Sequence, residues 1–102
     1  MINIRSVSCS EFERVKPFIS NLFPSAIVQL CDDDLIFVAE ENGKVVGFLH
    51  MIEYEESFVL EGIGVKESSR NSGVGSLLMS HVCELAEGSG KPVHLKVKCM
   101  NP

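Results

Sequence analysis

The chain opens with alternating apolar and polar residues, and this pattern predicts a half-buried strand over residues 2–7. Apolar positions then recur at helical spacing between residues 12 and 23, and Ser8 or Ser10 is placed to cap the helix. Pro17 lies inside this second pattern, so we expect a kink or two shorter helical pieces. A short helical turn is expected next, over residues 24–31.

Residues 35–54 carry a strong hairpin pattern. Two β-rich runs flank Asn42 and Gly43, a dipeptide that readily adopts the positive φ angles of a tight hairpin turn. Gly47, early in the second run, indicates a bulge. A turn near residues 55–56 then leads into a third β-rich run.

This third run, residues 57–65, has glycine at two interior positions, Gly62 and Gly64. Glycine weakens the interior of a strand, so the pair points to a bulge or to a close approach of another group to the backbone. The alternative is that the two glycines only relieve crowding against a neighbouring helix.

A helix is predicted from residue 74, after a polar loop, and it is expected to end at Gly88, with Gly90 and Pro92 behind it. A final strand over residues 93–99 would place Val93, Leu95 and Val97 inward. The helix is expected to bury one apolar face, made of Val74, Leu77, Leu78, Val82, Leu85 and Ala86.

The order of these elements predicts an α/β fold with a mixed, mainly antiparallel sheet flanked by helices. A crossover helix joins the last two strands, which are therefore parallel. The length of 102 residues is that of a single domain spanning 1–102.

Charge and cysteine usage exclude several classes of function. The formal net charge is −5 and no basic cluster is present, so nucleic-acid binding is not expected. The acidic clusters are typical of solvated turns, or they attract a cationic substrate.

The four cysteines show neither paired nor metal-ligand spacing, so we expect reduced thiols and no metal site. With no signal peptide and no long apolar run, the expected location is the cytoplasm, away from membranes. Each histidine is interpreted as a strand or helix-surface residue rather than a ligand.

The loop before the predicted helix has the features of an anion site. The first N–H groups of a helix lack partners, and the helix dipole favours negative charge. Gly73 and Gly75 would let a ligand approach the backbone, and Arg70 adds a positive charge, so pyrophosphate is the expected guest. The dinucleotide fingerprint fails because Leu78 stands where its third glycine belongs, and no P-loop sequence occurs. The alternative is that the two loop glycines form a plain turn.

The stretch Arg70-Asn71-Ser72-Gly73-Val74-Gly75 resembles the R/Q-x-x-G-x-G/A signature of the GNAT superfamily of acyl-CoA-dependent N-acetyltransferases. Val65 precedes the arginine by five residues, as in the family, although Glu67 replaces the usual proline. Val97 and Asn101 match a later V-x-x-x-N step. The resemblance covers essentially the whole chain.

The resemblance implies acetyl-CoA as co-substrate and no metal. In this family the pantetheine lies between two parallel strands that splay apart, and it pairs with the backbone of the first strand. Gly62 and Gly64 would then serve the bulge and the close approach. Carried over position by position, the expected cofactor-binding residues are Ile63, Gly64, Val65, Arg70, Asn71, Ser72, Gly73, Val74, Gly75, Ser76 and Asn101.

The implied reaction is acetyl transfer to a primary amine of a small molecule or protein, by direct attack on the thioester. Glu61 is the expected catalytic base, with Glu53 on the adjacent strand as a second candidate; the alternative is that Glu61 faces solvent. A backbone N–H near Val65 would stabilise the oxyanion. The competing interpretation is a non-catalytic acyl-CoA-binding or regulatory module on the same fold.

The chain departs from the family pattern at its C-terminal end. The family usually protonates the departing thiolate with a tyrosine on a helix after the last strand, and this sequence ends at Asn101 and Pro102, where that helix should begin. Tyr54, the only tyrosine, is expected in the hairpin. We therefore expect the C-terminal part to be missing or supplied by a partner, as in a homodimer formed through the edge of strand 93–99.

Overall fold

The computed structural model describes residues 2–22 and 34–96. The helices and strands are β1 (Ile2–Val7), α1 (Cys9–Leu22), β2 (Asp34–Glu41), β3 (Lys44–Glu53), β4 (Phe58–Val65), a short 3₁₀ helix η1 (Glu67–Ser69), α2 (Val74–Ser89) and β5 (Val93–Leu95). The strands form one sheet in the order β1-β2-β3-β4-β5, in which only the β4–β5 pair is parallel. The predicted sheet is confirmed. The turn expected over residues 24–31 and the last three residues of strand 93–99 lie outside the described residues.

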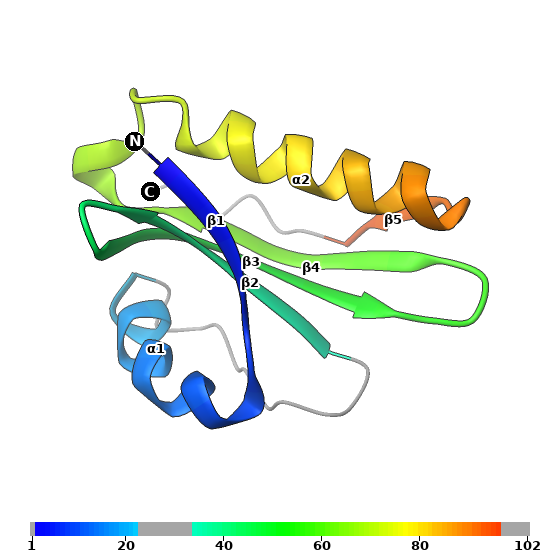
Figure 1. The fold of residues 1–102 in the computed structure, drawn as a ribbon, viewed down its shortest axis with the longest axis horizontal. Coiled ribbons are helices and arrows are strands. Elements are labelled where there is room, and N and C mark those ends of the chain that lie inside the picture. The colour runs from blue at the N-terminus through cyan, green and yellow to red at the C-terminus, as the bar shows by residue number, and fades with distance from the viewer. Residues whose placement is uncertain (1, 23–33, 97–102) are drawn as a thin grey trace.

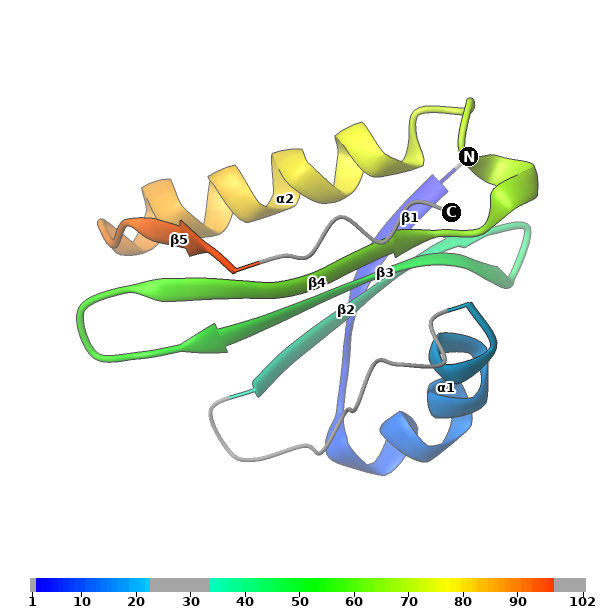
Figure 2. The same ribbon diagram turned by 180° about the vertical axis from the view of Figure 1, so that it is seen from behind.

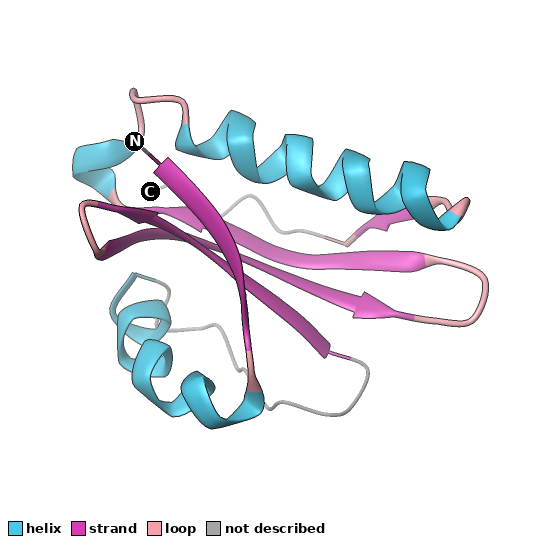
Figure 3. Ribbon diagram, viewed as in Figure 1, coloured by secondary structure: helices cyan, strands magenta, loops and turns pink. Residues whose placement is uncertain are grey.

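Helices cover both faces of this sheet, with α2 on one face and α1 on the other (Figures 1 and 2). Successive side chains of each strand point to opposite faces of the sheet, so the strands contribute to an apolar layer on each side. The core under α2 contains Phe37, Ala39, Val46, Leu49, Met51, Phe58 and Leu60 from the sheet, with Val74, Leu78 and Val82 from the helix. Helix α1 covers the opposite face, as the cyan and magenta ribbons of Figure 3 show. Alternation along β2 and β3 places Ile36, Val38 and Phe48 on this face; they are buried, as are Phe12 and Val15 of α1. We refer to this side as the α1 face.

The β2–β3 hairpin turns at Asn42 and Gly43, whose φ angles are 53° and 79°. This confirms the turn predicted from the dipeptide. The bulge predicted near Gly47 is also present: the register shifts between Ala39 and Glu40, which leaves Val46 as the extra residue on β3.

Gly47 itself has a separate role in packing. A Cβ atom at this position would lie 3.0 Å from Cγ1 of Val74 and 3.1 Å from the carbonyl oxygen of Gly64. The absence of a side chain therefore lets the first turn of α2 lie directly on β3 beside β4.

The first helix is one continuous element through Pro17, not two shorter pieces, and Ser8 is the residue before it. The predicted end of the second helix was wrong. The second helix ends at Ser89 and not at Gly88, because Gly90 adopts the left-handed conformation (φ 71°) and its N–H donates to Ala86 O.

More side chains were predicted to face the core than the structure buries. Leu77 is 42% exposed and Leu95 is 69% exposed, although both were expected to face the core. Helix α2 buries only the narrow stripe of Val74, Leu78 and Val82. Strand β5 is at the edge of the sheet, and Val93 packs against the core while staying partly exposed.

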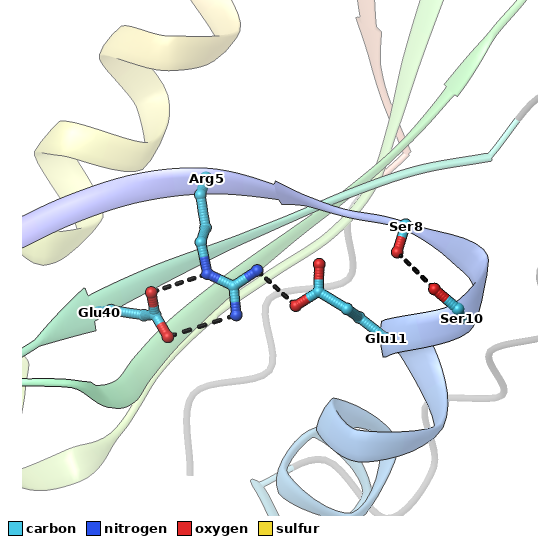
Figure 4. A network of polar contacts seen from close by, with 5 residues as sticks. All are labelled: Arg5, Ser8, Ser10, Glu11 and Glu40. Atoms are coloured by element: carbon cyan, nitrogen blue, oxygen red, sulfur yellow. Dashed lines mark hydrogen bonds and ion pairs between the residues drawn. The ribbon is translucent and has the colours of Figure 1, made fainter.

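Arg5 joins the start of α1 to the sheet (Figure 4). Its Nε donates to Glu40 at 2.7 Å, and its Nη1 donates to Glu11 of α1 at 2.7 Å. The hydrogen bond to Glu40, and then that to Glu11, raise the pKa of Arg5 above its ordinary value. At the same helix end, the hydroxyls of Ser8 and Ser10 lie 3.0 Å apart. These contacts fix the start of α1 against β1 and β2.

Candidate coenzyme and acetyl-transfer site

Glu61 is the extra residue of a bulge in β4. On the facing strand, His50 pairs with Gly62 and Met51 pairs with Leu60, so Glu61 has no partner on β3. The predicted bulge in this glycine-containing run is therefore present, one residue before Gly62. A bulge bends its strand and shifts the alternation of the residues that follow.

The pairing between β4 and β5 ends at the same place. Three residue pairs join the strands, the last being Leu60 with Leu95, and the final hydrogen bond runs from Lys96 N to Leu60 O at 3.1 Å. From Glu61 to Val65, β4 has no β5 partner within the described residues. The open stretch of β4, residues 61–65, is thus free along one edge.

The bulge decides which backbone groups point to that open edge. Lys66 N donates to Val46 O on β3 at 2.7 Å, so by alternation Gly64 also directs its N–H and C=O toward β3. Ile63 and Val65 direct theirs toward the open edge. Consistent with this, Arg70 Nε donates to Val65 O at 3.3 Å, and this contact holds the guanidinium at the end of β4.

The loop that follows β4 leaves most of the predicted amides free. Within the described structure, the N–H groups of Asn71 and Gly73 donate no hydrogen bond. The N–H groups of residues 74–76 belong to the first turn of α2, so no carbonyl of a preceding helical turn accepts their hydrogen bonds. Ser72 is the exception, because its amide donates to Ser69 O at 3.2 Å and its hydroxyl donates to the same oxygen at 2.6 Å.

Gly73 makes this group of amides accessible. It precedes α2 in the left-handed conformation, with φ 84°, and a Cβ atom there would meet no atom within 4 Å. The free amides, the positive end of the α2 dipole and Arg70 therefore converge on one surface, which suits a phosphate-bearing ligand.

The side chain of Glu61 is 25% exposed, and its Oε1 lies 3.9 Å from Nζ of Lys96, which is 76% exposed. The second candidate base lies elsewhere: Glu53, at the far end of β3, accepts a hydrogen bond from Lys91 Nζ at 2.9 Å. Lys91 also donates to Tyr54 O at 2.9 Å.

His50 and Asp34 form a pair that the sequence analysis did not find. His50 Nε2 lies 2.9 Å from Asp34 Oδ1, and the two side chains are 13% and 8% exposed. Asp34 belongs to an acidic cluster of the kind typical of solvated turns, yet its side chain is largely buried. The hairpin register supplies the missing signal, because Asn42 and Gly43 at the turn, with one bulge, bring the start of β2 beside the end of β3, where Asp34 pairs with Ile52, two residues from His50.

A scan of the chain against family models matches the acetyltransferase (GNAT) family over residues 3–102. The chain belongs to the GNAT acetyltransferase family. The resemblance inferred from Arg70 to Gly75 is thereby confirmed. No curated protein matches the sequence.

Solved GNAT structures share the fold of this chain at low identity. A ribosomal-protein-alanine N-acetyltransferase from Brucella melitensis biovar Abortus has 15% identity and a TM-score of 0.82, with 98% of this chain and 82% of that chain covered. The Escherichia coli ribosomal-protein-S18-alanine N-acetyltransferase has 20% identity and a TM-score of 0.81, with 99% and 70% covered. The aminoglycoside N-acetyltransferase AAC(6')-Iy, solved with CoA, has 20% identity and a TM-score of 0.77, with 99% and 80% covered.

The GNAT family uses acetyl-CoA. Asn101, predicted as a coenzyme contact, lies outside the described residues. Within the described part of the chain, neither helix is long and apolar enough to cross a membrane.

Proposed function

We propose that this protein is an N-acetyltransferase that moves the acetyl group of acetyl-CoA to a primary amine of a small molecule or protein, in the cytoplasm. The observation that carries the proposal is a path of backbone groups, most of which have no partner among the described residues. It begins at the bulge of Glu61, follows the open stretch of β4, and ends at the free amides around Gly73.

Along this path the pantetheine would pair with Ile63 and with the N–H of Val65 as an added strand, since the Val65 carbonyl already accepts from Arg70 Nε. The pyrophosphate would accept hydrogen bonds from the free amides of residues 71 and 73–76, with Arg70 neutralising part of its charge. Gly64 assists through its lack of a side chain, since its backbone is directed to β3. The role of the Ser72 amide has to be smaller than predicted, because Ser69 O already accepts its proton.

The thioester would then lie at the bulge, next to Glu61. The amine nitrogen attacks the carbonyl carbon, and a backbone N–H near Val65 donates to the developing oxyanion. Glu61 accepts a proton from the attacking nitrogen. The carbon–sulfur bond breaks, the electron pair leaves with the sulfur, and the thiolate takes up a proton to give free CoA.

The alternative function is a non-catalytic acyl-CoA-binding module, and two measurements separate it from the enzyme. Calorimetry with CoA tests the site itself. Thiol release from acetyl-CoA tests turnover, with sisomicin, spermidine, a lysine peptide and a peptide with N-terminal alanine as acceptors. Binding without release on any acceptor supports the module, and absence of binding contradicts both functions.

Arg70→Ala is expected to weaken CoA binding about tenfold, equivalent to about 1.4 kcal/mol, because a charge-assisted hydrogen bond to pyrophosphate is lost. The measurement is the calorimetric Kd for CoA. Arg14→Ala, on the exposed side of α1, is the matched control and should leave the Kd unchanged. A Kd for Arg70→Ala within twofold of the wild type would remove Arg70 from the site.

We also propose that two copies associate through the edge of β5, where Leu95 is 69% exposed. An unpaired edge strand offers N–H and C=O groups to a second chain. Light scattering at high micromolar concentration should give the mass of a dimer, which Leu95→Lys should reduce to that of a monomer. A wild-type monomer under these conditions contradicts the association.

A further inference from the structure

The chemistry of the acceptor calls for two proton acceptors, and this inference rests on the proposed function. An alkyl amine has an ordinary pKa of about 10.4, so at neutral pH it arrives as an ammonium ion. The nitrogen carries three protons on arrival and one in the amide product. One departing proton ends on the CoA thiol and the other goes to solvent. The Glu61 carboxylate can hold only one of these two protons at a time.

The His50–Asp34 pair is the second titratable group built into this part of the sheet. Both side chains are largely buried, and they are joined at 2.9 Å across the β2–β3 hairpin. An imidazole that donates from Nε2 to a carboxylate keeps its Nδ1 lone pair for accepting a proton. The carboxylate then stabilises the imidazolium that forms, as in other His–Asp pairs.

The register places His50 next to the bulge that contains Glu61. His50 pairs with Gly62, the residue after Glu61. Because Leu49 and Met51 belong to the core under α2, alternation puts His50 on the α1 face, together with Phe48. A Cβ atom on Gly62 would lie 3.7 Å from Cε2 of Phe48, so the Phe48 ring packs beside Gly62 on that face.

Within residues 2–22 and 34–96, the remaining charged groups are paired elsewhere, paired with Glu61, or at least partly exposed. Arg5, Glu11 and Glu40 are paired with one another, away from Asp34. Lys96 Nζ lies 3.9 Å from Glu61 Oε1. His94, on β5, and Glu13, Arg14 and Lys16, on α1, are exposed.

We propose that His50, held by Asp34, accepts the first proton of the acceptor ammonium, while Glu61 accepts the second during attack. In the first step an N–H bond of the ammonium breaks, its electron pair stays on nitrogen, and the proton binds Nδ1 of His50. The imidazolium later returns this proton to water. In the second step the nitrogen, now bonded to the acetyl carbon, gives a proton to Glu61.

His50→Gln tests this assignment through the pH profile of kcat/KM. Glutamine still donates a hydrogen bond to Asp34 but does not accept the ammonium proton. With the fastest acceptor among sisomicin, spermidine, the lysine peptide and the N-terminal alanine peptide, kcat/KM at pH 7 should fall about 10- to 100-fold. Near pH 10 the kcat/KM of His50→Gln should be less than about threefold below that of the wild type, because much of the amine is then already neutral when it binds.

Three companion variants make the result specific. His94→Gln, an exposed histidine of the neighbouring strand, is the matched control and should keep the wild-type profile. His50→Ala should regain activity when imidazole is added, which a purely structural residue would not do. Asp34→Asn should show the same pH-dependent deficit as His50→Gln, with a CoA Kd equal to that of the wild type.

The outcomes separate this inference from the proposed function. Wild-type turnover with parallel pH profiles for wild type and His50→Gln overturns the role of His50 alone. Loss of cooperative unfolding in all three variants of the pair assigns it to the fold and also overturns the role. CoA binding by the wild type with no thiol release on any acceptor overturns the proposed function, and the inference with it.

Discussion

Glu61→Gln is expected to lower kcat about 100-fold or more, because a carboxamide cannot accept the amine proton that general-base catalysis removes. The side chain keeps its size and the bulge is formed by the backbone, so CoA should bind as in the wild type. The measurements are thiol release under saturating acetyl-CoA and the calorimetric Kd for CoA. A large fall in kcat with an unchanged Kd places Glu61 in the chemical step.

Glu53→Gln is the matched control on the same sheet. Glu53 is 45% exposed and paired with Lys91 at the far end of β3, away from the bulge. Its replacement should change kcat by less than about twofold, since a surface ion pair contributes only about 0–1 kcal/mol. The reverse result, with Glu53→Gln inactive and Glu61→Gln active, would contradict the assignment of the base.

Gly47→Val is expected to lower the free energy of unfolding by roughly 3 kcal/mol or more, since overpacking a tight core forces side chains and backbone to shift. The first added carbon would already lie 3.0 Å from Val74 and 3.3 Å from Leu78, both fully buried, and 3.1 Å from a backbone carbonyl oxygen. Urea denaturation measures the loss. Weaker CoA binding should accompany it, because Val74 begins α2.

Gly88→Ala provides the contrast. Gly88 lies inside α2, and a Cβ atom there would meet nothing within 4 Å. Alanine should therefore stabilise the protein by about 0.5–1 kcal/mol through its higher helix propensity. If Gly47→Val and Gly88→Ala changed stability equally, the close approach of α2 to β3 would not be what Gly47 permits.

Local signals in the sequence predicted most of the fold. The Asn42-Gly43 turn, the three β-rich runs and the crossover helix each depend on neighbouring residues, and the structure confirms them. The errors concern properties set by tertiary contacts. Leu77 has the spacing of a core residue, yet α2 approaches the sheet along a stripe too narrow to cover it.

The C-terminal end of α2 also shows that local sequence signals do not decide between neighbouring alternatives. Gly88 and Gly90 are equivalent as stop signals in the sequence. Only Gly90 adopts positive φ, because its N–H reaches Ala86 O and α2 continues through Gly88.

The part of the candidate site that a single segment forms could be predicted from the sequence. The contacts between residues on different strands could not. The resemblance of residues 70–75 predicted the candidate anion loop, although the internal hydrogen bond of the Ser72 amide required the structure. The Glu53–Lys91 pair joins residues 38 positions apart, so no local pattern reveals it. The His50–Asp34 pair spans 16 positions and becomes visible once the hairpin register is known.

Lys91 closes one end of the pair of parallel strands. Its ammonium group binds Glu53 and the carbonyl of Tyr54, both at 2.9 Å, and lies 5.3 Å from the centre of the Phe58 ring. These contacts tie the start of β5 to the β3–β4 turn. If the coenzyme binds along β4 as proposed, a long acyl chain extending past the bulge would meet this closed end, so short acyl groups would be preferred.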